Sequence, residues 1–395
     1  MKNKILIFNF VPYYGGADRC IIEMICNLRE KFDFYVVSPD KSSPDYINAL
    51  RLNRIKYKAI TENEKKDLIG GKNQLYRILK LILKILHYIK LSHNLYKIIK
   101  QVNPNLICTH NFKSVFIFLL HPKLRGKKIC LYLHGWYNSK QMTYFSKYVC
   151  RRRNIKIVTV SRATKTALIS NGVSHRKIRV IYNPIDINYV IEESKKKLQN
   201  QLIIDPLSIK ILLPAGIMYE KGQHIAIEAV SRLQKNGIKN IELLFCGEEY
   251  KIQNNNYIDK LITKINELEL KDTVHFLGFR KDLYQIMRLS QIVILPSYSE
   301  GLPRIILEAM ALKKPVIATP VGGITDLIID NLTGLIMEID DAQSLAGKLK
   351  LLIMNKELGK YISNNAFKLA NIFTIKKFNQ EMGQYLEDII NPDIH

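Results

Sequence analysis

The chain has 395 residues, of which 47% are hydrophobic, and a formal net charge of +25 at pH 7. A chain of this length exceeds the usual size of one hydrophobic core, so we expect two domains. The ordinary hydrophobic content, with 19 Gly and 13 Pro, excludes long disordered linkers and a collagen-like chain.

The excess positive charge lies in the first half of the chain. Residues 1–200 contain 38 Lys and Arg against 12 Asp and Glu, a net charge of +26, and residues 201–395 contain 22 against 23, a net charge of −1. This asymmetry predicts two domains with different partners. A nucleic acid would suit the charge, but the sequence has no recognised nucleic-acid motif, so we expect no such partner.

Cysteine usage and hydropathy indicate a cytoplasmic protein. The six cysteines have no C-x-x-C spacing, which favours free, mostly buried thiols in a reducing compartment over zinc ligands or disulfides. The apolar stretch at residues 5–8 is too short for a secretion signal, and no run reaches 18 apolar residues.

The first half alternates strands and helices in the manner of a parallel α/β sheet. A strand over residues 5–10 is followed by a loop that ends at Gly15-Gly16 and by a helix over 18–28. Because glycine has no Cβ, Gly15 and Gly16 can bring the backbone close to a ligand phosphate. A glycine pair after a strand is more often only a turn, so this signal is weak by itself.

The stretch from Lys72 to Lys100 contains no acidic residue. Its basic residues recur at helical spacing with Leu, Ile and Tyr between them, which predicts an amphipathic helix. One interpretation is a helix packed on the sheet with a solvated lysine face. The other is a helix lying on an anionic membrane surface, and both interpretations account for the pattern equally.

Two histidines follow the next predicted strands. His110 comes after a strand over residues 105–108, and His134 after a strand over 128–133. Ligands of open parallel sheets bind beyond the carboxyl ends of the strands, and both histidines occupy such ends. The alternative for each is a structural histidine. Further strands are expected over 157–161 and 177–183.

The second half begins near Asp186 with a predicted helix over residues 192–202 and a strand over 209–213. Lys221-Gly222 precedes another helix, so the Lys221 ammonium can reach a phosphate near that helix end. The later expected elements are strands over 241–246, 274–277 and 315–319, helices over 342–354 and 356–373, and a final segment over 374–390 that crosses back to the first domain.

The functional prediction depends on a strand–loop–helix stretch at residues 291–310. The β-branched run at 292–295 predicts a buried strand, 296–301 a turn, and Pro303 the first position of a helix. The N–H groups of Gly301 and Leu302 would point to one spot, which attracts phosphate.

Two carboxylates flank this spot. Glu300 lies in the loop, and Glu308 lies about five residues into the helix, roughly 7–8 Å along its axis. That is about the distance from a diphosphate to its ribose. A carboxylate there can accept hydrogen bonds from the ribose hydroxyls. The same spacing separates Glu220 and Glu228, so the strand–loop–helix context carries the prediction and the spacing alone does not.

The sequence SEGLPRIILEAMALKKPVIAT resembles the family 4 glycosyltransferases of the GT-B fold, whose E-x7-E motif maps onto Glu300 and Glu308. The resemblance implies an α/β protein with two doubly wound Rossmann-like domains facing a central cleft. We expect an N-terminal acceptor domain over 1–185, a C-terminal nucleotide-sugar domain over 186–373, and a C-terminal helix over 374–395 that returns to the first domain.

The resemblance also implies a role for each matching residue. Gly15 and Gly16 are expected to face the donor diphosphate, Lys221 to bind the donor phosphate, and the N–H groups of Gly301 and Leu302 to bind the departing diphosphate. Glu300 is expected to bind sugar hydroxyls and Glu308 the ribose. His134 is expected to orient the sugar or phosphate, and His110 to lie nearer the acceptor. The expected catalytic residues are Glu300, His134 and Lys221.

Three positions depart from the family pattern. Gly216 stands where an arginine is usual, which removes one of two cationic phosphate contacts, and Arg280 and Arg304 are candidates to replace it. Asp326 stands where a GG-x-x-E loop would have glutamate, and Pro184 where a glycine is usual.

We therefore expect a retaining, metal-independent glycosyltransferase without a cofactor, and a UDP-sugar rather than a GDP-sugar as donor. The basic first half suggests a lipid-linked saccharide acceptor in assembly of a bacterial surface polysaccharide, with the protein peripheral at the inner face of the cell membrane. The alternatives are a nucleotide-sugar epimerase of related fold and a non-catalytic basic binding protein.

Overall fold

The structure is a computed structural model that describes residues 2–8, 15–39, 44–60, 74–137, 141–199, 205–249 and 256–392, without the side chains of 74–82 and 84. The chain divides into two compact units. The first unit comprises residues 1–160, 165–181 and 378–395, and the second comprises 161–164 and 182–377. The change between units after the seventh strand lies between Ile181 and Tyr182.

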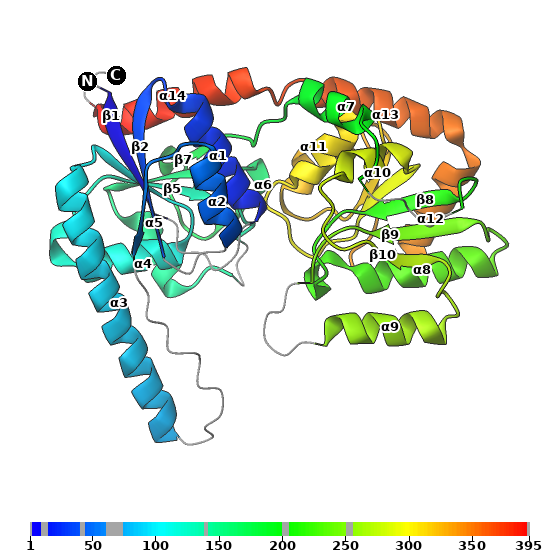
Figure 1. The fold of residues 1–395 in the computed structure, drawn as a ribbon, viewed down its shortest axis with the longest axis horizontal. Coiled ribbons are helices and arrows are strands. Elements are labelled where there is room, and N and C mark those ends of the chain that lie inside the picture. The colour runs from blue at the N-terminus through cyan, green and yellow to red at the C-terminus, as the bar shows by residue number, and fades with distance from the viewer. Residues whose placement is uncertain are drawn as a thin grey trace. The chain divides into compact units, whose positions relative to one another are not determined.

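The first unit is built on a seven-stranded parallel sheet in the order β3-β2-β1-β4-β5-β6-β7 (Figure 1). The chain reverses its direction of travel across the sheet between β1 and β4, so these two strands flank the switch point where ligands bind in such sheets. The strands are β1 (Asn3–Phe8), β2 (Phe32–Pro39), β3 (Tyr57–Ile60), β4 (Leu106–Thr109), β5 (Ile129–Leu133), β6 (Ile155–Thr159) and β7 (Ile178–Val180).

Helices connect these strands and cover the sheet, as parallel strands require. They are α1 (Gly16–Leu28), α2 (Pro44–Leu52), α3 (Gln74–Val102), α4 (Phe112–Leu120), α5 (Tyr144–Arg151) and α6 (Arg162–Ser170), with 3₁₀ turns η1 (Pro122–Leu124) and η2 (His175–Lys177). The C-terminal helix α14 (Ile375–Ile390) also contributes to this unit, since Lys128 Nζ donates to Ile390 O at 2.7 Å and Tyr385 Oη to Ile157 O at 3.3 Å.

The second unit has a six-stranded parallel sheet in the order β10-β9-β8-β11-β12-β13. This order is that of the Rossmann fold, with its switch point between β8 and β11. The strands are β8 (Ile209–Leu213), β9 (Ile241–Phe245), β10 (Val274–Phe276), β11 (Ile292–Leu295), β12 (Val316–Ala318) and β13 (Leu335–Ile336).

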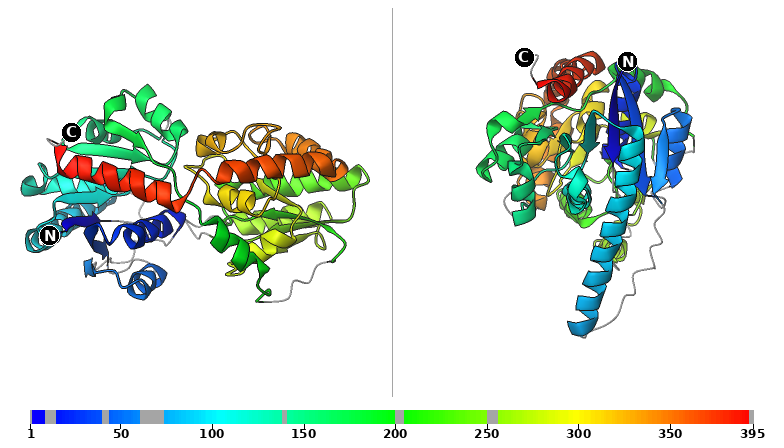
Figure 2. Two further views of the ribbon diagram at one scale, coloured as in Figure 1. Left: turned by 90° about the horizontal axis from the view of Figure 1, so that it is seen from above. Right: turned by 90° about the vertical axis from the view of Figure 1, so that its left-hand side faces the viewer.

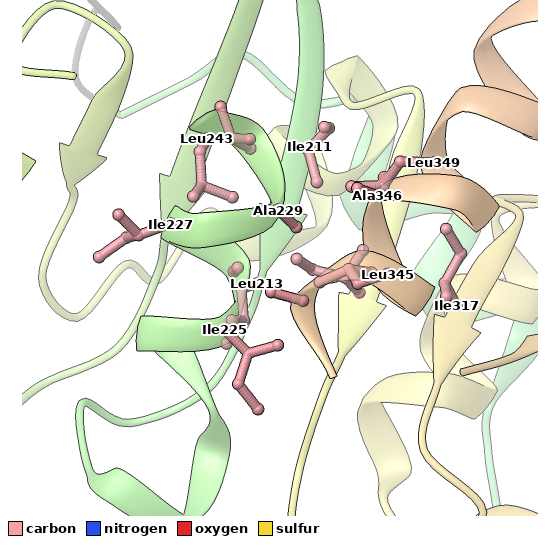
Figure 3. Close-up of a cluster of buried hydrophobic side chains, with 14 of the residues drawn as sticks. Ile211, Leu213, Ile225, Ile227, Ala229, Leu243, Ile317, Leu345, Ala346 and Leu349 are labelled. Atoms are coloured by element: carbon pink, nitrogen blue, oxygen red, sulfur yellow. The ribbon is translucent and has the colours of Figure 1, made fainter. Parts of the chain in front are cut away.

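The core of the second unit lies between this sheet and helices α8 and α12, where aliphatic side chains from all three interdigitate (Figure 3). Ile211, Leu213 and Leu345 are fully buried there. The helices are α7 (Ile187–Lys195), α8 (Gln223–Lys235), α9 (Tyr257–Glu267), α10 (Leu283–Leu289), α11 (Arg304–Ala311), α12 (Ala342–Met354) and α13 (Lys356–Ala370), with 3₁₀ turns η3 (Tyr219–Lys221) and η4 (Gly322–Asp326).

The predicted fold class is confirmed as two Rossmann-like units with parallel sheets. Three expected elements, the strands over 209–213 and 292–295 and the helix over 342–354, have the observed bounds. The helix expected over 192–202 was misplaced, because α7 begins at Ile187. Asp186 caps it by accepting a hydrogen bond from Tyr189 N at 2.9 Å, which the charge pattern after Glu192 did not reveal.

Helix α3 has two parts with different surroundings, which we call its first half (residues 74–90) and its second half (residues 91–102). Leu91, Leu95 and Ile98 in its second half are buried against the sheet, beside side chains of α4 and α5. The first half extends beyond the other elements of this unit (Figures 1 and 2), and Leu83, Leu86 and Ile89 are 58%, 56% and 47% exposed. The expected packing on the sheet therefore holds for the second half of the helix only.

The two halves should respond differently to the same substitution. We expect Leu95→Ala to lower the free energy of unfolding by about 2–5 kcal/mol, because it opens a cavity in the core. Leu86→Ala should change it by no more than about 0.5 kcal/mol, because the side chain is mostly exposed. Urea unfolding followed by circular dichroism measures both, and equal losses would contradict the division of the helix.

Candidate active site

Two loops of the second unit, after β8 and after β11, meet at the switch point of its sheet. Gly222 closes the first loop with φ +71°, and a Cβ there would lie 2.2 Å from Pro296 O in the second. Only glycine therefore fits this contact without a backbone shift. The close approach places Lys221, at the end of η3, beside the loop that carries Glu300.

Lys221 and Glu300 form an ion pair with 2.6 Å between Nζ and Oε1. Their side chains are 22% and 12% exposed, so the pair is largely shielded from water. Ser297 Oγ donates to the same Oε1 at 2.9 Å. The two predicted residues are thus brought together, although 79 positions separate them in the sequence.

A third loop, after β12, supports the Glu300 segment from the other side. Thr319 Oγ1 donates to Ser297 O at 2.5 Å, and Gly323 N donates to Glu300 O at 3.4 Å. A Cβ at Gly323 would lie 2.0 Å from Gly301 O, so this contact also requires glycine. The backbone around Glu300 is therefore fixed by loops from three neighbouring strands.

Gly301 and Leu302 are buried and lead into α11. The helix starts at Arg304 with Pro303 as its N-cap, one residue later than expected, because Pro303 has an extended ψ of 107°. Proline offers no side-chain acceptor, so it cannot cap the first-turn N–H groups, which remain suited to an anion. Glu308 is the fifth residue of the helix.

Glu308 is in contact with a tyrosine from α10. Tyr284 Oη donates to Glu308 Oε1 at 3.3 Å. Burial, and next the charge of Glu308, raise the pKa of the Tyr284 hydroxyl, so it stays protonated and remains a donor. Tyr284 thereby orients the carboxylate that the sequence assigns to the ribose.

Arg280 is not an obvious substitute for the arginine that the family pattern has at position 216. Its Nε and Nη2 donate to the two oxygens of Asp282, each at 2.7 Å, and Asp282 is buried. The Arg280 guanidinium lowers the pKa of the Asp282 carboxyl, so this is a charged structural pair. At position 216, where the family pattern has arginine, Gly216 O accepts a hydrogen bond from Gln223 Nε2 at 2.9 Å. Arg304, the first residue of α11, remains the candidate.

The two predicted histidines pair with each other in the first unit. His110 Nδ1 and His134 Nε2 are 3.2 Å apart, and the Tyr132 ring centroid lies 4.1 Å from that of His134. Burial lowers the pKa of His134 to about 3 and lowers that of His110 well below its usual value. Both rings are therefore neutral near pH 7, and one donates to the other.

Gly15 and Gly16 stand at the start of α1 in the first unit. Gly15 N donates to Asp18 Oδ2 at 2.9 Å, and no atom of the described residues lies within 4 Å of a Cβ built on either glycine. The loop residues 11–14 before them lie outside the described residues. Among the residues that the structure describes, no close contact explains this glycine pair.

Sequence reasoning missed the residues that orient the two glutamates. Ser297 lies in the quoted motif but carried no signal of its own, because one serine in a turn is common. Thr319 and Tyr284 are 22 and 24 positions from their partners and belong to other elements. Within the described part of the chain, no three His, Cys, Asp or Glu side chains form a group that could hold a metal ion.

Comparison with known proteins supports the fold and shows the family. Residues 14–189 match the family described as Glycosyltransferase Family 4, and residues 194–369 match glycosyl transferases group 1. Together these matches cover most of the chain. The chain belongs to the family 4 glycosyltransferases. It is therefore an enzyme, a glycosyltransferase, which excludes the non-catalytic alternative.

Two curated relatives of this glycosyltransferase are named for lipid-linked acceptors. The chain is 24% identical to N-acetylgalactosamine-N,N'-diacetylbacillosaminyl-diphospho-undecaprenol 4-alpha-N-acetylgalactosaminyltransferase of Campylobacter jejuni, over 97% of this chain and 99% of that protein. It is 22% identical to UDP-Gal:alpha-D-GlcNAc-diphosphoundecaprenol alpha-1,3-galactosyltransferase of Escherichia coli, over 75% and 79%.

A solved structure shares the whole fold. HepE of Anabaena, crystallised with UDP and glucose, aligns with a TM-score of 0.79 and 23% identity over 98% of this chain and 100% of that one. The similarity confirms the GT-B fold of this glycosyltransferase.

The neutral histidine pair predicts a loss of stability in acid. Because the pKa of His134 is about 3 in the folded chain, the unfolded state binds a proton below about pH 6.5 that the folded state does not. The free energy of unfolding should then fall as the pH decreases from 7 to 5, by up to about 1.4 kcal/mol per pH unit for one histidine.

Urea unfolding at several pH values tests this expectation. His134→Gln should reduce the dependence on pH, whereas His175→Gln, at an exposed position of the same unit, should leave it unchanged. Equal slopes for wild type and His134→Gln would show that the His134 ring is not held neutral.

Proposed function

We propose that this glycosyltransferase moves a sugar from a UDP-sugar to a hydroxyl of a lipid-linked saccharide, with retention of the anomeric configuration and without a metal ion. The observation that carries the proposal is the Lys221–Glu300 pair, held at the switch point of the second unit before the start of α11. Its chemistry matches a negatively charged diphosphate attached to a sugar.

Lys221 can serve Glu300 and a phosphate at the same time. An ammonium has three N–H donors, of which one points to Glu300 Oε1. The other donors can bind diphosphate oxygens, together with the N–H groups at the start of α11. These fixed positive groups would stabilise the charge that develops on the departing diphosphate.

Glu300 is suited to hold the transferred sugar. Lys221 and Ser297 both donate to Oε1. The second oxygen, Oε2, accepts neither of these bonds and remains for hydroxyl groups of the sugar. Because the surrounding loops fix the carboxylate, the sugar would be placed with its anomeric carbon in a defined position relative to the diphosphate.

The reaction we propose exchanges one bond at the anomeric carbon for another. The bond from that carbon to the diphosphate oxygen breaks, and the acceptor oxygen forms its bond on the same face. The acceptor proton passes to the departing diphosphate, which avoids a separate base. His134 would orient the sugar or phosphate, and His110 would lie nearer the acceptor. We expect the rate to be unchanged by EDTA.

The proposed classes of donor and acceptor are supported by the names of similar proteins and by the charge of the first half of the chain. UDP occurs in the name of the E. coli relative and in the HepE complex. Both curated relatives are named for saccharides on diphospho-undecaprenol. An acceptor with a charged diphosphate also suits the net charge of +26 on residues 1–200. A place in bacterial surface polysaccharide assembly follows from such an acceptor.

The epimerase alternative makes a different prediction for the donor alone. A nucleotide-sugar epimerase would convert the donor without any acceptor, whereas a glycosyltransferase needs the acceptor for a new glycosidic bond. Chromatography of the products after incubation with donor alone therefore separates the two, and an epimerised sugar would overturn the proposal.

Nucleotide binding should depend on Glu308. In a thermal-shift screen of UDP, GDP, ADP and their sugars, we expect the largest stabilisation from UDP and a UDP-sugar. Glu308→Gln should weaken UDP binding about 10- to 100-fold, because hydrogen bonds from ribose hydroxyls to a charged acceptor are lost.

The matched control is Glu267→Gln, an exposed glutamate at the end of α9, which should bind UDP like the wild type. Stronger stabilisation by GDP or ADP would refute the choice of donor. Unchanged UDP affinity in Glu308→Gln would refute the role of that carboxylate.

We further propose that the first half of α3 rests on an anionic membrane surface. Leu83, Leu86 and Ile89 recur every three residues and expose large apolar side chains, and Lys90 lies exposed beside them. An apolar stripe with basic neighbours is typical of helices that lie in the lipid interface. No helix among the described residues is long and apolar enough to cross a membrane.

Sedimentation with vesicles that contain anionic lipid tests this surface. At low salt we expect the wild type to bind and a Leu83→Ser, Leu86→Ser, Ile89→Ser triple variant to lose most of its binding. Binding should also weaken at high salt, which screens the charges.

Leu52→Ser is the control, because Leu52 is a 76% exposed leucine on α2 of the same unit. It should bind vesicles like the wild type. Failure of the wild type to bind at low salt, or full binding by the triple variant, would refute the membrane contact.

A further inference from the structure

A hydrogen-bonded aromatic cluster lies directly beside the Lys221–Glu300 pair. Tyr219, two residues before Lys221, stacks on His224 and on Tyr298, with ring centroids 4.7 and 5.2 Å apart and interplanar angles of 13° and 14°. Tyr298 is two residues before Glu300. The cluster therefore joins the two segments that carry the proposed catalytic residues.

The hydrogen bonds of this cluster have a defined direction. Tyr298 Oη donates to Asp340 Oδ1, a carboxylate that can only accept. Tyr298 Oη must therefore accept the hydrogen bond from His224 Nε2, 3.1 Å away. His224 then carries its proton on Nε2, and its Nδ1 accepts from Tyr257 Oη at 2.8 Å, a shorter contact than the 3.4 Å from the same hydroxyl to Gln223 Oε1.

Burial lowers the pKa of the His224 ring, with Lys264 as the next cause in the same direction, so the ring is neutral near pH 7. A neutral imidazole has one donor and one acceptor, as this chain of bonds requires. The order is thus Tyr257, His224, Tyr298 and Asp340, each hydroxyl or ring N–H donating to the next.

The cluster is coupled to the active-site backbone by a main-chain bond. Tyr298 N donates to Glu220 O at 2.9 Å, which ties the residue before Lys221 to the loop of Glu300. A shift of the Tyr298 ring would move this loop, and with it Ser297, whose hydroxyl donates to Glu300. The side-chain bonds thereby restrain the direction of the Glu300 carboxylate.

We propose that His224, Tyr298 and Asp340 are positioning residues that hold Glu300 in the direction needed to bind the sugar of the donor. The inference rests on the proposed function of Glu300. We do not assign any contact with the substrate to these three side chains. They act through the loop, so their loss should weaken binding of the sugar and not of the nucleotide.

Calorimetric titration with UDP and with UDP-glucose, UDP-galactose and UDP-N-acetylglucosamine tests the proposal. The measured quantity is the affinity for the UDP-sugar that binds best, divided by the affinity for UDP. Tyr298→Phe keeps the stacked ring and removes only the hydroxyl. We expect it to lower this ratio about 10-fold, as Glu300→Gln should, with UDP affinity changed less than about 3-fold.

Asp340 provides an independent test, since its side chain is 61% exposed and its left-handed backbone, with φ of +59°, is one that Asn and Gly also adopt. Asp340→Asn keeps an oxygen acceptor for Tyr298 and should keep at least half of the ratio. Asp340→Gly removes the acceptor without straining the left-handed backbone and should lower the ratio like Tyr298→Phe. Tyr361→Phe, at an exposed tyrosine of α13, is the control and should behave as the wild type.

The outcomes separate the inference from the function on which it rests. A normal ratio in Tyr298→Phe and Asp340→Gly, with a reduced ratio in Glu300→Gln, would overturn the positioning role alone. Absence of binding by UDP and all three UDP-sugars to the wild type, or a normal ratio in Glu300→Gln, would overturn the proposed function.

Discussion

The site depends on one electrostatic interaction, the ion pair between Lys221 and Glu300 at the switch point of the second sheet. A mostly buried pair loses much of its hydration, and its Coulomb attraction offsets that loss only in part, so it is weak support for stability. Such a pair needs a backbone that brings the charges together without large side-chain movement. Gly222 and Gly323 provide this, because each allows a contact between loops that a Cβ would prevent.

The two units divide the work by charge and by surface. The second unit, with a net charge of +4 over residues 161–164 and 182–377, presents the start of helix α11, a lysine and two oriented glutamates. The first unit is strongly basic and presents a neutral histidine pair and a helix that exposes Leu83, Leu86 and Ile89. A nucleotide sugar suits the former, and an acceptor attached to lipid suits the latter.

Much of the fold was predictable because parallel strands are continuous apolar runs. The strands at 209–213 and 292–295 are marked by such runs, and their place before Gly-containing loops predicts ligand-binding ends. The helix after Asp186 was misplaced because one capping side chain, and not the charges that follow, determines where it begins. The exposed half of α3 was also not predictable, since its pattern is the same as that of the buried half.

The candidate site was predictable in its charged residues and not in their supports. Glu300, Glu308 and Lys221 follow from a local pattern and a family resemblance, and their roles remain predictions. Tyr284, Thr319 and the bonds of Tyr298 depend on contacts between elements 20 to 80 positions apart, which no local pattern encodes. Interactions of this kind require the three-dimensional structure.

A crystal structure of the protein with UDP bound would test the account most directly. We expect diphosphate oxygens within hydrogen-bond distance of the Gly301 and Leu302 N–H groups and of Lys221 Nζ, and ribose hydroxyls on the Glu308 carboxylate. UDP bound elsewhere, or a ribose that does not contact Glu308, would contradict it.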